Sequence, residues 1–516
     1  MESLWERRGP AAAIIVAALF FIAPLWCVSS PAMPDFPAHL ASYYLIGAGN
    51  GASPFYSLEW AFIPNLAAEI GVPFLAHFMA LDAAARLFLS LGVAMWVIGP
   101  SLIHRALYGR FGFAPLAAAF FAYNANFMWG FINYYFAAGL SLVVFAAWIA
   151  TDGRRRPWMI AGFAVAVTVV YFSHIFASCM LVLMMGCFEL SGFTQRRDTK
   201  DFRRQLISIA IAFVPAAIAF LFLRPHAGGD TSRLEFDIVS TFMERVNAMV
   251  QWNYDRPALL LLVPLAALLV FAIRRRLVTF HKRMFFVLIA FALGTFLAPE
   301  WAMGGWGVEL RMPAVFCSLV FASATLHVSP KRAAIAVAVC LAVMAYCAAT
   351  LAGNWMYYDR RYSEFRTVSA TMPHNEKVLT VLDGSAIGMA SDQLYWHVGE
   401  FGIIDRNAFT QLMFGTAGQH VIRLRKAYRS FAADSAQQGS PPDITELDDL
   451  AAGQVDGDTD IRDTFPYLMY YQCHFDQAVV IDLNGTHSPL PTRLKLRHDG
   501  SFFSIYDISH AGCPKR

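Results

Sequence analysis

Residues 31–40 read Pro-Ala-Met-Pro-Asp-Phe-Pro-Ala-His-Leu and closely follow the first long apolar segment, Ala11–Ser29. Asp35 and His39 are four residues apart, so they share one face if the segment is helical. Two interpretations stay open for the carboxylate. Asp35 is suited to cap a short helix that has Pro37 in its first turn. Alternatively, Asp35 is a catalytic group at a membrane surface.

The composition indicates an integral membrane protein. Hydrophobic residues make up 57% of the chain, charged residues only 15%, and the mean hydropathy is +0.46, whereas soluble domains carry about 25% charged residues. The net charge of +3 gives no indication of nucleic-acid binding, because the basic residues lie in short loops. Arg7 and Arg8 favour a cytoplasmic N-terminus, and the first apolar segment is predicted to be a retained signal anchor.

About eleven apolar segments have the 15 to 20 residues that a membrane span needs. They are Ala11–Ser29, Ala84–Ile103, Gly112–Met128, Ile132–Ala150, Pro157–Ser173, Ile175–Ser191, Leu206–Leu223, Pro257–Ile273, Arg283–Ala298, Met312–Leu326 and Arg332–Leu351. With a cytoplasmic N-terminus, most loop Lys and Arg residues then fall on the cytoplasmic side, as the positive-inside rule requires. Residues 30–83 become one long periplasmic loop, for which we expect two short interfacial helices.

The composition changes near Gly353, so we divide the chain into a membrane module (1–352) and a periplasmic α/β domain (353–516). Predicted strands are Val378–Leu382, Ala478–Leu483 and Phe502–Ile508, and predicted helices are Tyr362–Met372 and Gly418–Phe431. Cys473 and Cys513 lie in this polar region and could form a disulfide in the periplasm. The other cysteines, in apolar spans, act as small hydrophobic residues.

The periplasmic loops collect carboxylates, aromatic rings and isolated arginines. Aromatic faces stack on sugars, Arg binds phosphate with two hydrogen bonds, and carboxylates accept a proton or hold a divalent cation. Simpler interpretations stay open: Glu69 is hydrogen-bonded within its loop, His174 is a packing residue, and the Asn and Tyr residues form an interfacial belt. No P-loop, GxSxG, HExxH or EF-hand pattern is present.

Several stretches resemble the GT-C superfamily of membrane glycosyltransferases. Asp35-Phe-Pro-Ala-His-Leu-Ala41 is similar to a D-x-P-x-H-L-A stretch in uncharacterised bacterial membrane proteins of this kind. The segments Trp60–Ala67, Ala85–Phe88 and Tyr171–Phe176 are also similar to parts of those proteins. The resemblance covers roughly the first 200 residues, and the remainder resembles the superfamily in architecture only. It implies a multi-pass protein of the bacterial inner membrane.

The resemblance implies sugar transfer from a polyprenyl-phosphate donor to a lipid-linked or envelope-glycan acceptor at the periplasmic face. Asp35 would match the superfamily's first-loop carboxylate, a general base or metal ligand, and Glu69 would assist it. A second acidic motif is missing around Trp129–Phe131, which weakens the case for a divalent metal, so the metal requirement stays open. The residues expected to bind substrate are His39, Asn124, Tyr134, His174, Arg233, Trp306, Glu309 and Arg311.

Among these, Arg311 or Arg233 would hold the donor phosphate. The alternative function is a non-enzymatic transporter or scaffold component of envelope polysaccharide assembly. A transporter would need polar residues along a route through the membrane midplane, whereas the polar groups here gather at one interface. The sequence therefore favours the transferase.

Overall fold

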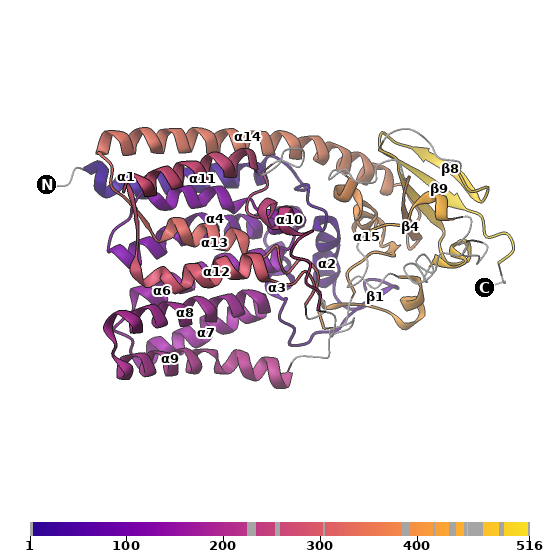
Figure 1. Cartoon of the computed structure of the whole chain (residues 1–516). Coiled ribbons are helices and arrows are strands. Elements are labelled where there is room, and N and C mark those ends of the chain that lie inside the picture. Colours follow the sequence, from indigo (N-terminus) through magenta and orange to yellow (C-terminus); the bar gives the residue numbers. More distant parts are fainter. Residues whose placement is uncertain are drawn as a thin grey trace.

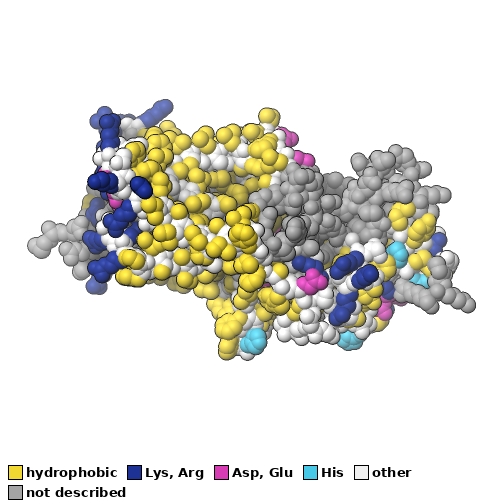
Figure 2. Space-filling view, turned by 90° about the horizontal axis from the view of Figure 1, so that it is seen from below, with side chains coloured by type: hydrophobic (Ala, Val, Ile, Leu, Met, Phe, Trp, Pro, Cys, Tyr) yellow, Lys and Arg dark blue, Asp and Glu magenta, His cyan; other side chains and the backbone are white. Residues whose placement is uncertain are grey.

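The computed structural model describes residues 4–223, 234–252, 259–302, 305–383, 392–415, 418–432, 440–447, 451, 468–483 and 490–513. Side-by-side helices form a bundle, and a smaller domain with a β-sheet lies beyond one end of it (Figure 1). The helices of the bundle are α1 (Leu4–Trp26), α4 (Leu81–Tyr108), α6 (Ile132–Ala150), α7 (Pro157–Ser173), α8 (Ile175–Arg196), α9 (Thr199–Ile218), α11 (Leu259–Arg274), α12 (Phe285–Leu297), α13 (Pro313–Ala322) and α14 (Pro330–Ser369). Hydrophobic side chains cover the long face of the bundle that Figure 2 shows.

Six described helices are long and apolar enough to cross a membrane. They are Arg8–Trp26, Leu81–Tyr108, Ile132–Ala150, Ile175–Arg196, Thr199–Leu223 and Pro330–Ser369. Each contains most of a predicted span. Shorter apolar helices, among them α7, α11 and α13, lie beside them. A polytopic membrane fold therefore follows from the structure, while the total of eleven spans stays a prediction.

The predicted span Gly112–Met128 is not one helix. A buried 3₁₀-helix, η1 (Ala114–Ala122), is followed by the short α5 (Ala125–Trp129). Asn124 separates them because its side chain accepts the Phe127 N–H at 3.3 Å and so caps α5. Pro115 at the start of η1 also lacks the N–H that a continuing helix would use. An apolar run alone did not reveal this break.

The loop between α1 and α4 contains the two short helices predicted for residues 30–83, α2 (Phe36–Ala48) and α3 (Ala67–Ala76). Between them, β1 (Tyr56–Leu58) pairs antiparallel with β6 (Ile422–Leu424) of the C-terminal domain. The predicted helix Gly418–Phe431 is therefore wrong. The extended Val-Ile-Arg-Leu run found a strand partner in the distant loop, and only a 3₁₀-helix, η7 (Lys426–Phe431), follows.

Helix α14 connects the bundle to the C-terminal domain without interruption (Figure 1). Its 40 residues give a length of about 60 Å at 1.5 Å per residue. The predicted helix Tyr362–Met372 is the end of this helix, and the predicted division at residue 353 falls inside it. The Asp359 carboxylate accepts the N–H groups of Ser29 at 3.1 Å and Ser30 at 2.8 Å, which ties α14 to the start of the first loop.

The C-terminal domain is built on a five-stranded mixed sheet of order β5-β4-β7-β9-β8. Its strands are β4 (Lys377–Leu382), β5 (Phe409–Thr410), β7 (Gln477–Ile481), β8 (Leu494–Asp499) and β9 (Phe503–Ile508). The three predicted strands correspond to β4, β7 and β9 and are confirmed. Cys473 and Cys513 form a disulfide, which links the segment before β7 to the segment after β9.

Candidate functional site

Asp35 lies at the end of the bundle that meets the C-terminal domain. Its backbone N–H donates to the Trp129 carbonyl at 3.1 Å. Gly130, in a left-handed conformation with φ of 96°, packs so closely that a Cβ there would lie 3.0 Å from the Asp35 Cβ. Asp35 occupies the N-cap position of α2, but its side chain accepts no hydrogen bond from the first turn. The capping interpretation is therefore wrong, and the carboxylate is available for another role.

The partner of Asp35 comes from the other end of the sequence. The Asp35 Oδ1 lies 4.0 Å from the His397 Nε2, and the His397 Nδ1 lies 3.4 Å from the Glu400 Oε1. His397 precedes the short helix η6 (Val398–Glu400), which packs against α2. The side chains of His397 and Glu400 are almost completely buried. Together, the three groups form a line of carboxylate, imidazole and carboxylate across the contact between the two parts of the chain.

The protonation of this line follows from burial and charge. Burial raises the pKa of the Asp35 carboxyl to about 6, and the nearby His397 only partly opposes this effect. Burial lowers the pKa of His397, but Glu400 and Asp35 outweigh it, so that the pKa of this imidazole is raised overall. A carboxyl with a pKa near the pH of the medium both accepts and releases a proton readily.

Two further histidines lie beside this line and are held neutral. Burial and the neighbouring imidazoles of His420 and His397 lower the pKa of His39 to about 3. Burial and Arg423 lower the pKa of His420 to about 4. The Phe414 ring lies 5.1 Å from the rings of His39 and His397 and 5.3 Å from that of His420. Neutral imidazoles can hydrogen-bond a substrate hydroxyl as donor or acceptor.

An aromatic wall extends from Asp35 toward Arg311. The Trp129 ring lies 5.2 Å from that of Trp306 and 6.4 Å from that of Trp396. The Arg311 guanidinium donates to the Trp306 carbonyl at 3.3 Å. In the part of the chain that the structure describes, no carboxylate lies within 4.0 Å of it. A cation without a carboxylate partner beside stacked rings is suited to an anionic ligand that also presents an apolar face.

Arg311 itself is surrounded by rings. Its guanidinium carbon lies 5.9, 5.5 and 5.6 Å from the ring centres of Phe131, Tyr134 and Phe176. The Tyr134 hydroxyl donates to the Arg311 carbonyl. Tyr134 therefore positions the arginine.

Glu309 and Trp306 lie in the same loop as Arg311. The Glu309 side chain is fully buried, and burial raises its pKa to about 7. The Trp306 Nε1–H donates to the Glu300 Oε1 at 3.1 Å. This bond fixes the orientation of the Trp306 ring toward Trp129.

Three other predicted site residues make structural hydrogen bonds. The Glu69 Oε2 accepts the Asn133 side-chain N–H at 2.7 Å, and this bond joins α3 to α6. Asn124 caps α5, as described above, and the His174 Nδ1 accepts the Phe176 N–H at 3.1 Å and so caps α8. No bond or ion pair described here links these three residues to Asp35. Arg233 lies outside the described residues.

The structure also adds residues that the sequence interpretation missed: Trp396, His397, Glu400, Phe414 and His420. The run Trp396-His-Val-Gly-Glu400 places an imidazole and a carboxylate three residues apart beside an indole, a signal that could have been found. Among the described residues, no group of three or more His, Cys, Asp or Glu side chains is arranged to hold a metal ion. Comparison with protein-family models, curated proteins and solved structures gave no match.

Proposed function

We propose that the protein is an inverting glycosyltransferase that uses a polyprenyl-phosphate-linked sugar at the periplasmic face of the bacterial inner membrane. The observation that carries this proposal is the Asp35 carboxylate, which is free of any capping bond and faces the buried His397–Glu400 pair. The acceptor is a lipid-linked or envelope glycan. The proposal rests on residue chemistry and on the sequence resemblance.

In the proposed reaction, an acceptor hydroxyl attacks the anomeric carbon of the donor sugar. The new bond joins the acceptor oxygen to that carbon, the bond between the carbon and the phosphate oxygen breaks, and the lipid phosphate leaves with the electron pair. Asp35 takes the hydroxyl proton, which suits a carboxyl whose burial raises its pKa to about 6. His397, oriented by Glu400, positions Asp35 and partly opposes the rise in its pKa.

Arg311 is the proposed ligand of the donor phosphate. A guanidinium binds phosphate with two parallel hydrogen bonds, and Trp306 and Trp129 supply flat surfaces for the sugar between Arg311 and Asp35. A continuous series of contacts connects Asp35 to Arg311. Asp35 donates its backbone N–H to the Trp129 carbonyl, the Trp129 ring packs against the Trp306 ring, and Arg311 donates to the Trp306 carbonyl.

The proposed orientation places the N-terminus in the cytoplasm and the C-terminal domain in the periplasm. Lys and Arg side chains gather at the end of the bundle farthest from the C-terminal domain (Figure 2), as the positive-inside rule expects for the cytoplasmic side. The Cys473–Cys513 disulfide is compatible with an oxidising periplasm. Both features agree with a periplasmic site at Asp35.

The test is complementation of a deletion strain, with lipid-linked sugars and envelope glycans measured by mass spectrometry. Asp35→Asn keeps the size of the side chain but cannot accept a proton, so we expect transfer to fall by about 10²- to 10⁴-fold. We expect the thermal unfolding temperature to stay unchanged, because the side chain caps nothing.

Glu59→Gln is the matched control, since it removes an exposed carboxylate from the same loop and keeps an acceptor for Arg423. It should restore the wild-type glycans. Full restoration by Asp35→Asn would remove the proposed base and, with it, this mechanism.

A further inference from the structure

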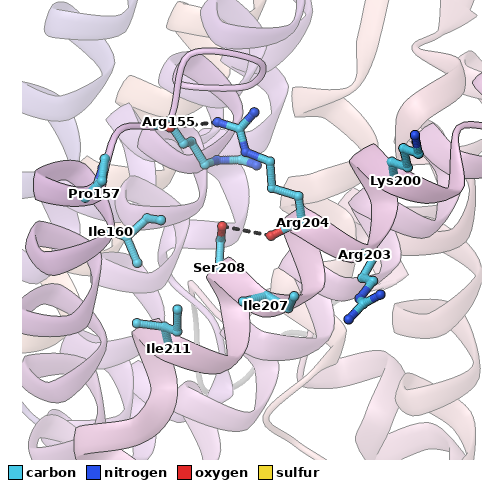
Figure 3. Close-up of a pocket in the computed structure, with 9 residues that line it drawn as sticks. All are labelled: Arg155, Pro157, Ile160, Lys200, Arg203, Arg204, Ile207, Ser208 and Ile211. Carbon is cyan, nitrogen blue, oxygen red and sulfur yellow. Dashed lines mark hydrogen bonds between the residues drawn. The ribbon is translucent and has the colours of Figure 1, made fainter.

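A hollow of about 470 Å³ lies between the starts of α7 and α9 (Figure 3). This is the end of the bundle where Lys and Arg side chains gather (Figure 2). The rim of the hollow carries Lys200, Arg203 and Arg204, all on α9 and all exposed. Its lining also includes Ile160 of α7 and Ile207 and Ile211 of α9. Cations therefore surround one end of the hollow, and branched apolar side chains line the other.

The neighbouring acidic groups are already engaged. The Asp198 Oδ1 accepts the backbone N–H groups of Lys200 and Asp201 at 3.0 Å each, and the Asp201 carboxylate lies 3.7 Å from Arg196. Within the described chain, no carboxylate lies within 4.0 Å of Lys200, Arg203 or Arg204. The only bond described here for these three side chains runs from Arg204 to the Arg155 carbonyl, at 3.2 Å. Their charge is thus available to a ligand.

Arg155 also lines the hollow, but its guanidinium already contacts other side chains of the protein and is not available to a ligand. Its guanidinium lies 3.0 Å from Glu189 and 3.6 Å from the centre of the Trp148 ring. It is therefore part of the internal packing of the helices, and it fixes Arg204 through the backbone bond.

The apolar part of the hollow is exposed on the outside of the bundle. Ile207 and Ile211 are 47% and 50% exposed, although they are large aliphatic side chains. Arg203, Ile207 and Ile211 follow at intervals of four residues, so they lie one below another on a single face of α9. Along the helix axis this face presents a cation and then an apolar strip, the order in which a phospholipid presents its phosphate and its acyl chain.

We propose that this hollow binds one anionic phospholipid. The headgroup phosphate lies among Lys200, Arg203 and Arg204, and an acyl chain lies along Ile207 and Ile211. Basic hollows between membrane helices at the cytoplasmic surface are favourable for anionic headgroups, with about 1 kcal/mol for each nearby cation. A zwitterionic lipid has no net charge, so three cations attract its headgroup much less strongly than that of an anionic lipid. The proposal is independent of sugar transfer, because it concerns the opposite end of the bundle.

The test measures lipid binding by native mass spectrometry of the delipidated full-length protein, titrated with phosphatidylglycerol or phosphatidylcholine. Phosphatidylglycerol should bind more tightly. The double variant Arg203→Gln, Arg204→Gln should weaken its binding by roughly 30-fold. The matched control is Arg274→Gln, Arg275→Gln, which removes the same charge from the end of α11, outside the hollow, and should have a much smaller effect.

Two further measurements distinguish a site for a phospholipid from a site for free phosphate. Ile207→Ser with Ile211→Ser should also weaken binding, and inorganic phosphate should not displace the lipid. The proposal is overturned if phosphatidylcholine binds equally well, or if the two double arginine variants behave alike. It is equally overturned if the isoleucine variant binds like wild type or if phosphate displaces the lipid.

Discussion

Asp35 owes its proposed reactivity to two residues that hold it and one that faces it. The Trp129 carbonyl accepts its backbone N–H, Gly130 packs closely against it, and its carboxylate makes no capping bond to α2. His397 faces it at 4.0 Å. Burial of Asp35 raises the pKa of its carboxyl because it disfavours the charged form, whereas the nearby His397 favours the charged form.

These opposing effects predict a pH dependence. Asp35 must be deprotonated to act as a base, so the transfer rate should fall below about pH 6, tenfold for each pH unit. His397→Gln removes the group that lowers the Asp35 pKa. The acid limb of the pH–rate profile, where the rate falls as Asp35 becomes protonated, should therefore move to higher pH. Initial rates measured across the pH range in membranes check both statements.

The exposed residue His77 offers a control, since it directly follows α3 and has no contact described here with Asp35. His77→Gln should leave the acid limb in place. An acid limb that stays in place in His397→Gln, or that moves to lower pH, would contradict the assigned contact between His397 and Asp35.

The sequence predicted two members of this site, Asp35 and His39, but not His397 and Glu400. Asp35 and His39 are neighbours on one helical turn, so a local pattern predicts that they lie together. His397 and Glu400 reach Asp35 only through tertiary packing of η6 against α2, and no local pattern contains that information. Glu69, Asn124 and His174 were predicted as site residues because they lie in or beside the outer loops. Polar groups there also form helix caps and interhelical bonds, and these three residues make bonds of that kind.

At the scale of elements, the hydropathy pattern predicted the positions of helices well but did not predict where an apolar segment is broken into two helices. Helix α7 has the predicted bounds, Pro157–Ser173. Gly112–Met128 failed because side-chain capping by Asn124 and the position of Pro115 break the helix without lowering the hydropathy. Gly418–Phe431 failed because the strand β6 is stabilised by a partner far away in the sequence.

Helix α14 predicts an element-scale effect at Gly353, an exposed residue with open space around its Cα. Gly353→Ala should raise the free energy of unfolding by about 0.5–1 kcal/mol, because alanine favours the helix. Gly353→Pro should cost about 3 kcal/mol and kink the helix.

Because α14 leads into the domain that carries His397, the proline variant should also lose sugar transfer, whereas the alanine variant should retain it. Thermal unfolding together with glycan analysis of the two variants checks this prediction. A fully active proline variant would show that α14 does not set the position of His397.

The disulfide gives a second element-scale prediction. Cys473 and Cys513 are paired, and the other six cysteines are free. Denatured protein should therefore bind six equivalents of a maleimide without reductant and eight after reduction. Cys513→Ser should lower the stability of the C-terminal domain by about 2–4 kcal/mol. Eight reactive thiols before reduction would contradict the pairing.

At the scale of the whole molecule, the bundle and the C-terminal domain are joined in three ways. α14 runs from one into the other, α2 packs against η6 and α15 (Phe401–Arg406), and β1 pairs with β6. The sequence predicted the two parts from their compositions. It did not predict how they meet, since each contact joins residues hundreds of positions apart.

The proposed orientation makes a whole-molecule prediction. In a chain whose six free cysteines are replaced, Glu59→Cys in the first loop should react with a membrane-impermeant maleimide added to intact spheroplasts. Arg154→Cys, between α6 and α7, should react only after the membrane is opened. Both parent side chains are exposed. The reverse pattern would place Asp35 in the cytoplasm and exclude a periplasmic transferase.

The pairing of β1 with β6 has a consequence for biogenesis. Ser57 and Arg423 are 366 residues apart, and a ribosome that adds about 5–20 residues per second needs roughly 20 to 70 s to make that stretch. During this interval β1 is a strand without its neighbour, and open strand edges attract other chains. The pairing of β1 with β6 therefore forms only after residues 422–424 have been made, so a chain that terminates before them would leave this edge open to chaperones and proteases.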